Sequence, residues 1–406
     1  MSGKSDKKKP LVPRLRFPDF REAGAWEVKR LGEVANISMG ASPKSASYND
    51  QRIGLPLIQG NADIKDRKSS PRLFASQITR ECWVGDILVG VRAPVGMVAK
   101  SEHHACIGRG ISALCVKGED RQEFLYQWLL WYEPHWVSIS QGGTFDSVNK
   151  NEITNLVALF PNPSEQQKVA HCLSSLDEVI GLQAKKVQAL KQHKKGLMQQ
   201  LFPAEGETTP RLRFPDFREA GAWEFIPLEA IAPLVNDRVQ LKDISNVNYV
   251  STENILQDFG GVAVANKLPT VNSVSSFQAG DVLLANIRPY LKKVWAANFS
   301  GGASNDVLVF RPRNSQGGQY VAHILKNNRF INYVMAGAKG VKMPRGDINS
   351  IKEYPVPIPP ETTEQQKIAH CLSSLDEVIG LESHKLDALK NLKKGLMQQL
   401  FPQEVA

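Results

Sequence analysis

Apolar residues recur along two segments of the chain at alternating steps of four and three residues. The steps run from Val169 to Leu201 in the first segment and from Ile368 to Leu400 in the second. This 3.5-residue period is typical of a helix that packs along a coiled-coil seam. The predicted apolar seam consists of Val169, Leu173, Leu176, Ile180, Val187, Leu190 and Leu197 in the first helix, and of Ile368, Leu372, Leu375, Ile379, Leu386, Leu389 and Leu396 in the second.

Local signals give the expected ends of these helices. Ser164 with Gln167, and Thr363 with Gln366, have the spacing of a capping box, in which two side chains satisfy the free N–H groups of the first turn. A proline follows each apolar pattern, at 203 and at 402, and stops helix propagation. The predicted helices therefore span residues 164–202 and 363–402.

Each seam is interrupted by two polar residues, which are Gln183 and Lys194 in the first helix and Glu382 and Lys393 in the second. Polar residues at seam positions fix the direction and register of a coiled coil. In an antiparallel pair, Lys194 would face Glu382 and Gln183 would face Lys393. The alternative is that each helix buries its apolar stripe against its own neighbouring domain.

The two helices belong to an internal repeat that organises the whole chain. Residues 13–27 and 210–224 carry the same fifteen letters, PRLRFPDFREAGAWE, and residues 194–203 recur unchanged at 393–402. Between these blocks lie two stretches that share almost no letters. We therefore divide the chain into a basic tail that we expect to be disordered, a first variable domain, a helix, a linker, a second variable domain, a second helix and a short tail, with bounds 1–12, 13–163, 164–202, 203–212, 213–362, 363–402 and 403–406.

Both variable domains carry strand-like runs together with one amphipathic helical stretch. The runs expected to form strands are 57–58, 85–89, 111–116 and 156–160 in the first domain, and 249–250, 280–284, 307–310 and 356–358 in the second. The helical stretches are 124–136 and 320–335. The predicted fold class is α+β, with two globular mixed α/β domains joined by two long helices that form an antiparallel coiled coil, and with an internal pseudo-two-fold repeat.

Composition excludes several classes of protein. The chain has 406 residues, is 42% hydrophobic and 22% charged, and contains no apolar run long enough to cross a membrane. Its five cysteines form no CxxC pair, and its first ten residues do not resemble a secretory signal, so we expect a cytoplasmic protein. The net charge of +9 permits a nucleic-acid partner without requiring one.

Signatures of catalysis and of cofactor binding are absent from the sequence. It contains no GxxxxGK[ST] phosphate loop, no GxGxxG after a strand, no HExxH or GxSxG, and no paired Cys/His metal spacing. We therefore expect no catalytic residues, no metal site and no cofactor bound by this chain.

One short pattern imitates a nuclease site. Asp19 followed by Glu27 and Lys29 resembles the PD…ExK arrangement, in which two carboxylates hold Mg²⁺ and a lysine orients water. The internal copy of this pattern has isoleucine at 226 in place of the lysine, which argues against a shared catalytic role. The alternative is that Phe17 and Phe20 pack on the helix or on a partner. A metal-dependent nuclease remains a second function, which cleavage by the purified chain with Mg²⁺ alone would support.

The repeated helix carries the resemblance to a known family. The motifs EQQKVAHCLSSLDEVIGL and KKGLMQQLFP closely resemble the helical regions of the specificity (S) subunit of type I restriction-modification enzymes. In the variable domains, Gly85-Asp86-Ile87-Leu88 leads to Arg92, and Gly280-Asp281-Val282-Leu283 leads to Arg288. The segments 141–144 and 339–345 occupy the place of a glycine loop of the family. The resemblance covers residues 25–402.

This resemblance implies a non-catalytic subunit that targets a restriction system to double-stranded DNA. Each variable stretch would be a target-recognition domain that reads one half of a bipartite, asymmetric site. The coiled coil would set the spacer and dock two methyltransferase (M) subunits, and restriction/motor (R) subunits would join for cleavage. The assembled complex would be an adenine-N6 DNA methyltransferase and an ATP-dependent endonuclease, with S-adenosylmethionine, ATP and Mg on the partner subunits. A third reading of the sequence is a protein-assembly scaffold whose variable domains bind protein.

Helix length gives an expected spacing between the two domains. A helix of about 37 residues is roughly 55 Å long at 1.5 Å per residue. Since ten base pairs of duplex rise about 34 Å, this length covers roughly 16 base pairs. We therefore predict two short recognised segments that are separated by unread base pairs.

Side chains that can form paired hydrogen bonds with base edges supply the candidate DNA contacts. In the first domain they are Lys44, Tyr48, Arg52, Gln59, Asn61, Arg92, Arg109, Gln141 and Thr144. In the second they are Arg238, Ser251, Asn254, Arg288, Tyr290, Lys292, Lys339, Lys342 and Arg345. Glycines 142, 143, 337, 340 and 346 would let the backbone approach the phosphates.

Overall fold

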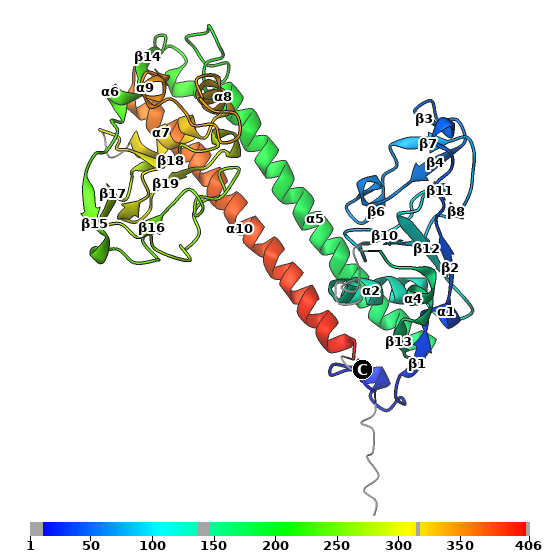
Figure 1. Ribbon diagram of the computed structural model, residues 1–406. Helices are drawn as coiled ribbons and strands as arrows, with labels where there is room; N and C mark the ends of the chain where they lie inside the picture. The colour runs from blue at the N-terminus through cyan, green and yellow to red at the C-terminus, as the bar shows by residue number, and fades with distance from the viewer. Residues whose placement is uncertain (1–10, 137–146, 314–316, 403–406) are drawn as a thin grey trace, which may run out of the picture. The chain divides into compact units, whose positions relative to one another are not determined.

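A computed structural model describes residues 11–136, 147–313 and 317–402 of the chain (Figure 1). The chain divides into two compact units. Unit 1 contains the described residues up to Ala184 and those from His384 onward, and unit 2 runs from Lys185 to Ser383. Each unit therefore contains one variable domain, part of the first long helix and part of the second.

The two long helices predicted from the seam are confirmed. They are α5 (Pro163–Leu201) and α10 (Thr362–Leu400), and each has 39 residues. The predicted capping residues are wrong. Asn162 Oδ1 accepts a hydrogen bond of 2.9 Å from the backbone N–H of Glu165, because Pro163 occupies the first helical position and places the cap before it. In the second copy the helix begins one residue before Thr363, whose hydroxyl donates to Glu361.

In each unit, the start of one helix packs against the end of the other. In unit 1, Val169 of α5 belongs to the same hydrophobic core as Leu400 of α10. In unit 2, Leu201 of α5 shares a core with Ile368 of α10. Within each unit the two helical segments therefore run antiparallel. None of the fourteen predicted apolar seam residues is exposed; five are buried and nine are half-buried.

The expected partners of the polar seam residues are corrected. Lys194 Nζ lies 2.5 Å from Asp376 Oδ2 in unit 2, and Lys393 Nζ lies 2.6 Å from Asp177 Oδ1 in unit 1. Glu382, the expected partner of Lys194, forms an ion pair with Lys186. The long lysine side chains reach past the seam to carboxylates on its flank, where the charged side chains of a coiled coil usually pair.

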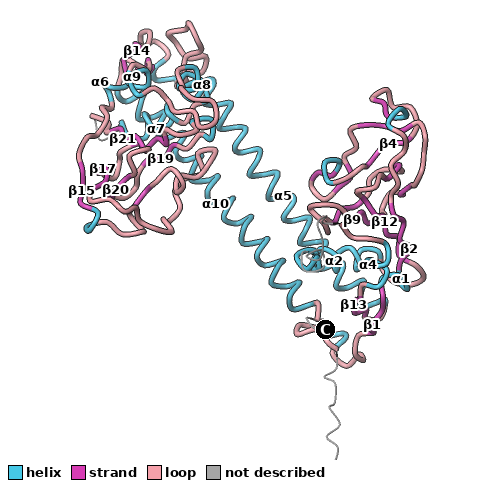
Figure 2. The backbone as a smooth tube through the Cα atoms, viewed as in Figure 1, coloured by secondary structure: helices cyan, strands magenta, loops and turns pink. Residues whose placement is uncertain are grey.

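The domain of unit 1 is built on two larger sheets and one strand pair, with its short strands joined by long loops (Figure 2). The six-stranded sheet has the order β2 (Ala35–Met39), β12 (Ile111–Val116), β9 (Ile87–Gly90), β10 (Val98–Lys100), β6 (Lys68–Ser69) and β5 (Ile64–Lys65). The five-stranded sheet has the order β3 (Tyr48–Asn49), β7 (Leu73–Ala75), β4 (Leu55–Ile58), β11 (Ala105–Ile107) and β8 (Glu81–Cys82).

Helices connect the six-stranded sheet to the long helices. The strand pair is β1 (Glu27–Arg30) with β13 (Val157–Phe160), and the helices are α1 (Leu31–Val34), α2 (Gln122–Tyr132) and α4 (Lys150–Asn155), with short 3₁₀ turns at Pro18–Phe20, Ser45–Ser47, Asn61–Asp63 and Glu133–His135. Ile87 of β9, Phe124 of α2 and Leu173 of α5 belong to one buried core. The sheet is therefore fixed to the long helix through α2.

Unit 2 repeats this plan with fewer strands. Its sheets are β15 (Arg238–Gln240), β17 (Ser273–Phe277), β20 (Gly301–Ala303) and β16 (Tyr249–Val250); then β19 (Val294–Ala296), β18 (Val282–Ala285) and β21 (Val307–Phe310); and the pair β14 (Glu224–Pro227) with β22 (Pro355–Ile358). Its helices are α6 (Leu228–Ile231), α7 (Gly318–Leu325), α8 (Asn328–Ala336) and α9 (Ile348–Lys352), with 3₁₀ turns at Pro215–Phe217, Leu241–Asp243 and Pro289–Leu291.

The single helix expected at 320–335 is two helices. Asn327 Oδ1 accepts a hydrogen bond of 3.0 Å from the N–H of Arg329 and thereby caps α8. An asparagine side chain competes for backbone groups in this way, so it favours a helix start over a helix interior. Val321 of α7 and Leu372 of α10 belong to the same buried core of unit 2, so α7 packs against α10.

The repeated segments 13–27 and 210–224 bind the start of each long helix. Arg16 forms a paired contact with the carboxylate of Glu165, at 2.8 and 2.7 Å, and Trp26 Nε1 donates to the same carboxylate. Arg213 forms the same pair with Glu364, at 2.7 Å for both bonds. Both glutamates are buried, and the guanidinium of the paired arginine compensates the negative charge of each carboxylate. No helix among the described residues is long and apolar enough to cross a membrane.

Candidate nucleic-acid interface

Two equivalent turns position the loops that carry the candidate DNA contacts. Gly85 and Gly280 have φ values of +91° and +95°, a conformation that favours glycine. The following carboxylates, of Asp86 and Asp281, each accept a hydrogen bond of 2.8 Å from the backbone N–H three residues earlier. These turns start the buried strands β9 and β18. In each domain the loop after that strand carries a predicted arginine.

In unit 2, the loop after β18 is bound to the loop that precedes α9. The N–H of Arg288 donates to the carbonyl of Pro344 at 2.8 Å, and the N–H of Gly346 donates to the carbonyl of Asn286 at 3.2 Å. Ile287 also pairs with Arg345 in a β-bridge. The structure therefore brings together six of the predicted contact residues, which we call the cationic loop cluster: Arg288, Tyr290, Lys292, Lys339, Lys342 and Arg345.

The second of these loops is a small hairpin. Lys339 and Arg345 exchange two backbone hydrogen bonds of 2.9 Å, which close the five residues 340–344 into a projecting turn. Gly340, at φ +96°, allows the chain to reverse. The side chain of Lys342 lies exposed within the turn.

Acidic residues accompany several of these cations. Lys339 Nζ lies 2.7 Å from Asp347 Oδ2, and Arg345 Nη2 lies 3.0 Å from Asp306 Oδ1. The Asp347 carboxylate raises the pKa of Lys339, and the Lys339 ammonium in turn lowers the pKa of Asp347. Each carboxylate therefore orients the cation beside it.

The remaining predicted residues of unit 2 lie on strand β15 and on the loop after β16, and they bond within the protein. Asn254 is 9% exposed, and its Oδ1 accepts from the Ser251 hydroxyl at 2.6 Å. Lys293 Nζ donates to the carbonyl of Thr252 at 2.6 Å, which places this loop beside the cationic loop cluster. Arg238 donates to the carbonyl of Ser273 at 2.6 Å. Base contacts by Arg238, Ser251 and Asn254 stay predictions.

In unit 1, four predicted residues gather on loops at one end of the sheets. The carbonyl of Gln59 accepts from the N–H of Gly110 at 3.1 Å, and that residue follows Arg109. Asn61 Nδ2 donates to the carbonyl of Pro94 at 2.9 Å, in the loop that also carries Arg92. The loops after β4, β9 and β11 therefore present Gln59, Asn61, Arg92 and Arg109 side by side.

The other predicted residues of unit 1 divide into four cases. The N–H of Arg109 donates to Ser42, so the segment that leads to Lys44 lies beside the same loops. Tyr48 is half-buried, and its hydroxyl donates to the carbonyl of Pro43 at 3.1 Å. Arg52 precedes β4, at the opposite end of that strand from the loop of Gln59. Gln141 and Thr144 lie outside the described residues.

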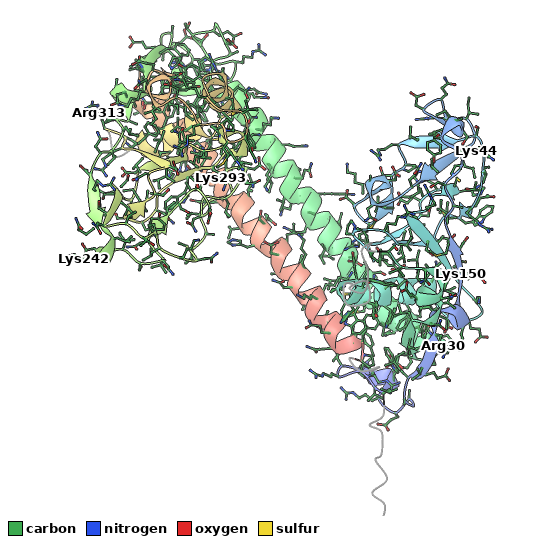
Figure 3. All side chains as sticks on the ribbon, in the orientation of Figure 1. Arg30, Lys44, Lys150, Lys242, Lys293 and Arg313 are labelled. Carbon is green, nitrogen blue, oxygen red and sulfur yellow. The ribbon has the colours of Figure 1, made fainter. Side chains whose placement is uncertain are left out.

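Figure 3 separates the exposed cations of unit 1. Lys44 lies at the end of the domain where β3, β4 and β7 lie, whereas Arg30 and Lys150 lie at the other end, beside β1 and α4. The predicted contacts of unit 1 thus do not include every surface cation.

Sequence reasoning missed Arg80 and the apolar tip of the hairpin. The carbonyl of Arg80 accepts from the N–H of Ile107 at 2.8 Å, which places this exposed arginine beside the Arg109 loop. Val341 and Met343 are strongly exposed within the hairpin. An alternation of cations with apolar residues at 339–345 was the available signal for this tip.

The nuclease-like pattern near the N-terminus is engaged in contacts within the protein. Asp19 lies 3.6 Å from the ammonium of Lys168, and that ammonium lies 6.0 Å from the centre of the Phe17 ring. Lys29 lies 3.4 Å from Glu27 and 3.6 Å from Asp120. Within residues 11–136, 147–313 and 317–402, no group of three or more His, Cys, Asp or Glu side chains is arranged to hold a metal ion.

Comparisons with known proteins identify relatives of both halves. The sequence profile of the type I restriction modification DNA specificity domain matches residues 24–192 and 222–391. The EcoDI type I restriction enzyme specificity subunit of Escherichia coli is 24% identical over 413 residues, covering 94% of this chain and 88% of the relative. A Methanocaldococcus jannaschii protein assigned as the MjaX type I restriction enzyme specificity subunit is 31% identical over 180 residues, covering 44% of this chain and 42% of the relative.

A solved structure has the same fold. The type I restriction-modification S subunit of M. genitalium aligns with a TM-score of 0.66 at 15% identity, covering 97% of this chain and all of that one. Since the family profile matches most of the chain, with one block in each half of the sequence, the chain belongs to the family of type I restriction modification DNA specificity domains.

Proposed function

We propose that this chain is a sequence-specific DNA-binding subunit without an active site of its own, in which each variable domain reads one half of a bipartite, asymmetric DNA site. The observation that carries the proposal is the cationic loop cluster, together with the equivalent loops of unit 1. In each domain one of these loops follows the strand that the Gly-Asp turn starts, β9 or β18, and the loops of unit 2 are tied to one another by backbone hydrogen bonds. Rigid loops that present arginine, lysine and amide side chains suit the readout of base edges.

The asymmetry of the site follows from the differences between the two sets of loops. In unit 1 the loop after the parallel-paired strand β4 carries Gln59 and Asn61, whereas the loop after its counterpart β16 carries Ser251 and Asn254. Different donors and acceptors at equivalent places select different bases.

Equivalent apolar pairs on the long helices support docking of two copies of one partner. Val179 and Leu182 of α5 are 46% and 60% exposed in unit 1, and Val378 and Leu381 of α10 are 41% and 70% exposed in unit 2. These pairs occupy the same place in the repeat. Exposed apolar side chains that lie one helical turn apart suit burial in a protein interface. We assign the pairs to two methyltransferase subunits, to which restriction/motor subunits add.

The chemistry of the assembled complex belongs to these partners. S-adenosylmethionine would bind the methyltransferase subunits for adenine-N6 methylation, and ATP and Mg would bind the motor subunits for cleavage. The role of this chain is to choose the site and to hold the partners over it.

Mapping methylated adenines tests the proposal. The chain is produced with the methyltransferase subunit of its own system in a host without adenine methylation, and N6-methyladenine is mapped across the genome. We expect one motif with two short recognised segments separated by a fixed number of unread base pairs. A chain in which residues 339–345 are exchanged for a Gly/Ser loop is expected to lose recognition of one segment only.

Other outcomes point to the alternative functions. Cleavage of DNA by the purified chain with Mg²⁺ alone would favour a nuclease built on Asp19, Glu27 and Lys29. Equal competition by specific and scrambled duplexes for the assembled complex would favour a protein-assembly scaffold.

The spacing of the two segments tests the role of the helices. Inserting four residues into one long helix adds about one turn, or roughly 6 Å at 1.5 Å per residue. We expect the mapped spacer to lengthen. An unchanged spacer in a complex that still methylates would contradict the proposal that helix length sets the spacing.

A further inference from the structure

The hairpin of unit 2 ends in two apolar side chains that the protein leaves in solvent. Val341 has a relative exposure of 103% and Met343 of 52%. Both lie between the closing residues Lys339 and Arg345. Large apolar side chains grouped at one projecting tip are characteristic of a surface that another molecule covers.

The neck of this hairpin is fixed to the body of the domain. Arg345 bonds to the backbone of Lys339 on one side and forms a β-bridge with Ile287 on the other. Its guanidinium also lies 3.0 Å from Asp306. Pro344, directly after the tip, is buried. The body therefore holds the tip outward, and the full exposure of Val341 shows that no described residue packs over it.

We propose that Val341 and Met343 contact the C5-methyl groups of thymines in the major groove, and so add apolar readout to the half-site that domain 2 reads. This inference rests on the proposed function, because it requires that the cationic loop cluster faces DNA. The occupant is the thymine methyl because this is the apolar group that base pairs display in the major groove.

The shape and charge of the hairpin favour the major groove over the minor groove. The turn is closed by a single β-bridge between Lys339 and Arg345. The major groove is about 12 Å wide, admits even a two-stranded ribbon and displays the thymine methyl group, whereas the minor groove is about 6 Å wide and displays none. Lys339, Lys342 and Arg345 surround the apolar tip with cations that suit the phosphates and guanines on either side.

Deoxyuridine scanning tests the inference, because deoxyuridine differs from thymidine only by the C5-methyl group. The full complex with its methyltransferase subunits is bound to a synthetic duplex that carries the mapped site. Each thymine in the segment that the 339–345 loop exchange affects is replaced singly. For the wild-type chain we expect about a fourfold loss of affinity at one or two positions, which corresponds to about 0.8 kcal/mol per buried methyl group.

Variants of the tip assign that loss to a side chain. Val341→Ser or Met343→Ser is expected to weaken binding to the thymine duplex by a similar factor and to remove the deoxyuridine penalty at one position. The control is Val247→Ser, which changes another exposed valine, 68% exposed, at the opposite end of strand β16 from the loop of Ser251. The control is expected to keep the full penalty.

The outcomes separate failure of this inference from failure of the proposed function. Absence of specific binding by the wild-type complex would overturn the proposed function. Specific binding without a deoxyuridine penalty in the affected segment, or with a penalty that survives in both tip variants, would overturn the thymine contact alone. A mapped segment that contains no A·T pair would do the same.

Discussion

The contacts that hold the long helices are the same in the two units, whereas the loops that face outward carry different side chains. Arg16 binds Glu165 in unit 1 as Arg213 binds Glu364 in unit 2. Asp177 likewise pairs with Lys393 in unit 1, and the residues at the same place in the repeat pair in unit 2. Each contact is made by side chains from distant parts of the sequence. The repeated letters therefore encode the same set of ion pairs in both units, in addition to the two long helices.

The outward loops use one backbone plan to carry different chemistry. In unit 1 they present amides and two arginines, and in unit 2 they present the cationic loop cluster with its acidic partners. The turns that start β9 and β18 are the same, because Gly85 and Gly280 share one backbone conformation. If the contacts that hold the long helices are stable without help from the loops, the loop side chains can change without loss of the fold. This division predicts that variants of these contacts alter stability, while loop variants alter base preference.

The largest expected effect comes from the buried ion pairs. Glu165→Gln leaves the Arg16 guanidinium, whose side chain is 9% exposed, without its compensating charge. We expect a loss of about 3–5 kcal/mol from the free energy of unfolding of unit 1. Glu364→Gln should destabilise unit 2 by a similar amount. Urea unfolding, followed by hydrogen exchange so that the units are resolved, measures both losses.

A matched surface variant controls this prediction. Lys168→Gln removes the exposed ion pair with Asp19 and should cost less than about 1 kcal/mol. If Glu165→Gln and Glu364→Gln each lower the free energy of unfolding by no more than this control does, the packing of the long helices does not depend on the buried ion pairs.

Loop chemistry should give the next largest effect, and only on one side of the DNA site. Arg345→Ala removes a guanidinium that is suited to a paired contact with guanine. We expect discrimination at one position of one half-site to fall by about 1–3 kcal/mol, with the other half-site unchanged. The mapped methylation motif measures both halves together. Arg313→Ala, whose guanidinium binds the carbonyl of Ala230, is the control; a uniform loss across sequences would reassign Arg345 to a phosphate.

The sequence predicted the helices better than their partners. A 3.5-residue period is a local signal, and it located α5 and α10 to within about two residues. The helix cap was misplaced because Ser164 and Asn162 both fit a cap, and only the position of Pro163 decides between them. The partners of Lys194 and Lys393 lie off the seam, where a helical pattern does not show which flanking carboxylate lies nearest.

The sequence predicted which residues belong to the candidate site but not how they are arranged in space. The Gly-Asp turns located the loops of Arg92 and Arg288, because glycine before a buried strand is a local signal. The bridge between Ile287 and Arg345 joins positions 58 residues apart, and no period in the sequence encodes it. For the same reason the sequence does not predict that Val341 is exposed, because its exposure depends on the hairpin that this bridge fixes.

A smaller effect should distinguish the units by pH. In unit 1, Gln127 donates a hydrogen bond to Asp177 of α5. In unit 2, buried His323 lies beside Asp376, which has the same place in α10. Burial first, and the Lys194 charge second, lower the pKa of His323 to about 3, with opposing attraction from Asp376. Since the unfolded imidazole binds a proton near pH 6.5 and the folded one does not, stability falls as pH drops below 6.5.

The variant His323→Gln should remove this pH dependence. At pH 5.5 the wild-type unit 2 should lose about 1.4 kcal/mol relative to pH 7.5, because each pH unit below the unfolded pKa costs about 1.36 kcal/mol. The difference between the wild-type and variant unfolding curves across this range isolates the histidine. Parallel curves would show that His323 is protonated in the folded state or that its proton uptake is not linked to unfolding.

The smallest expected effect tests the corrected pairing of the helices. Lys194→Glu replaces an ion pair with Asp376 by repulsion and should cost about 1 kcal/mol, because Asp376 is 40% exposed and solvent screens the charge. Asp376→Lys in the same chain should restore most of the loss, whereas Glu382→Lys should not, since Glu382 already pairs with Lys186. A double-mutant cycle on the free energy of unfolding measures the coupling. Rescue by Glu382→Lys alone would return Lys194 to the partner expected from the seam, and the pairing of unit 2 would then differ from that of Lys393 with Asp177 in unit 1.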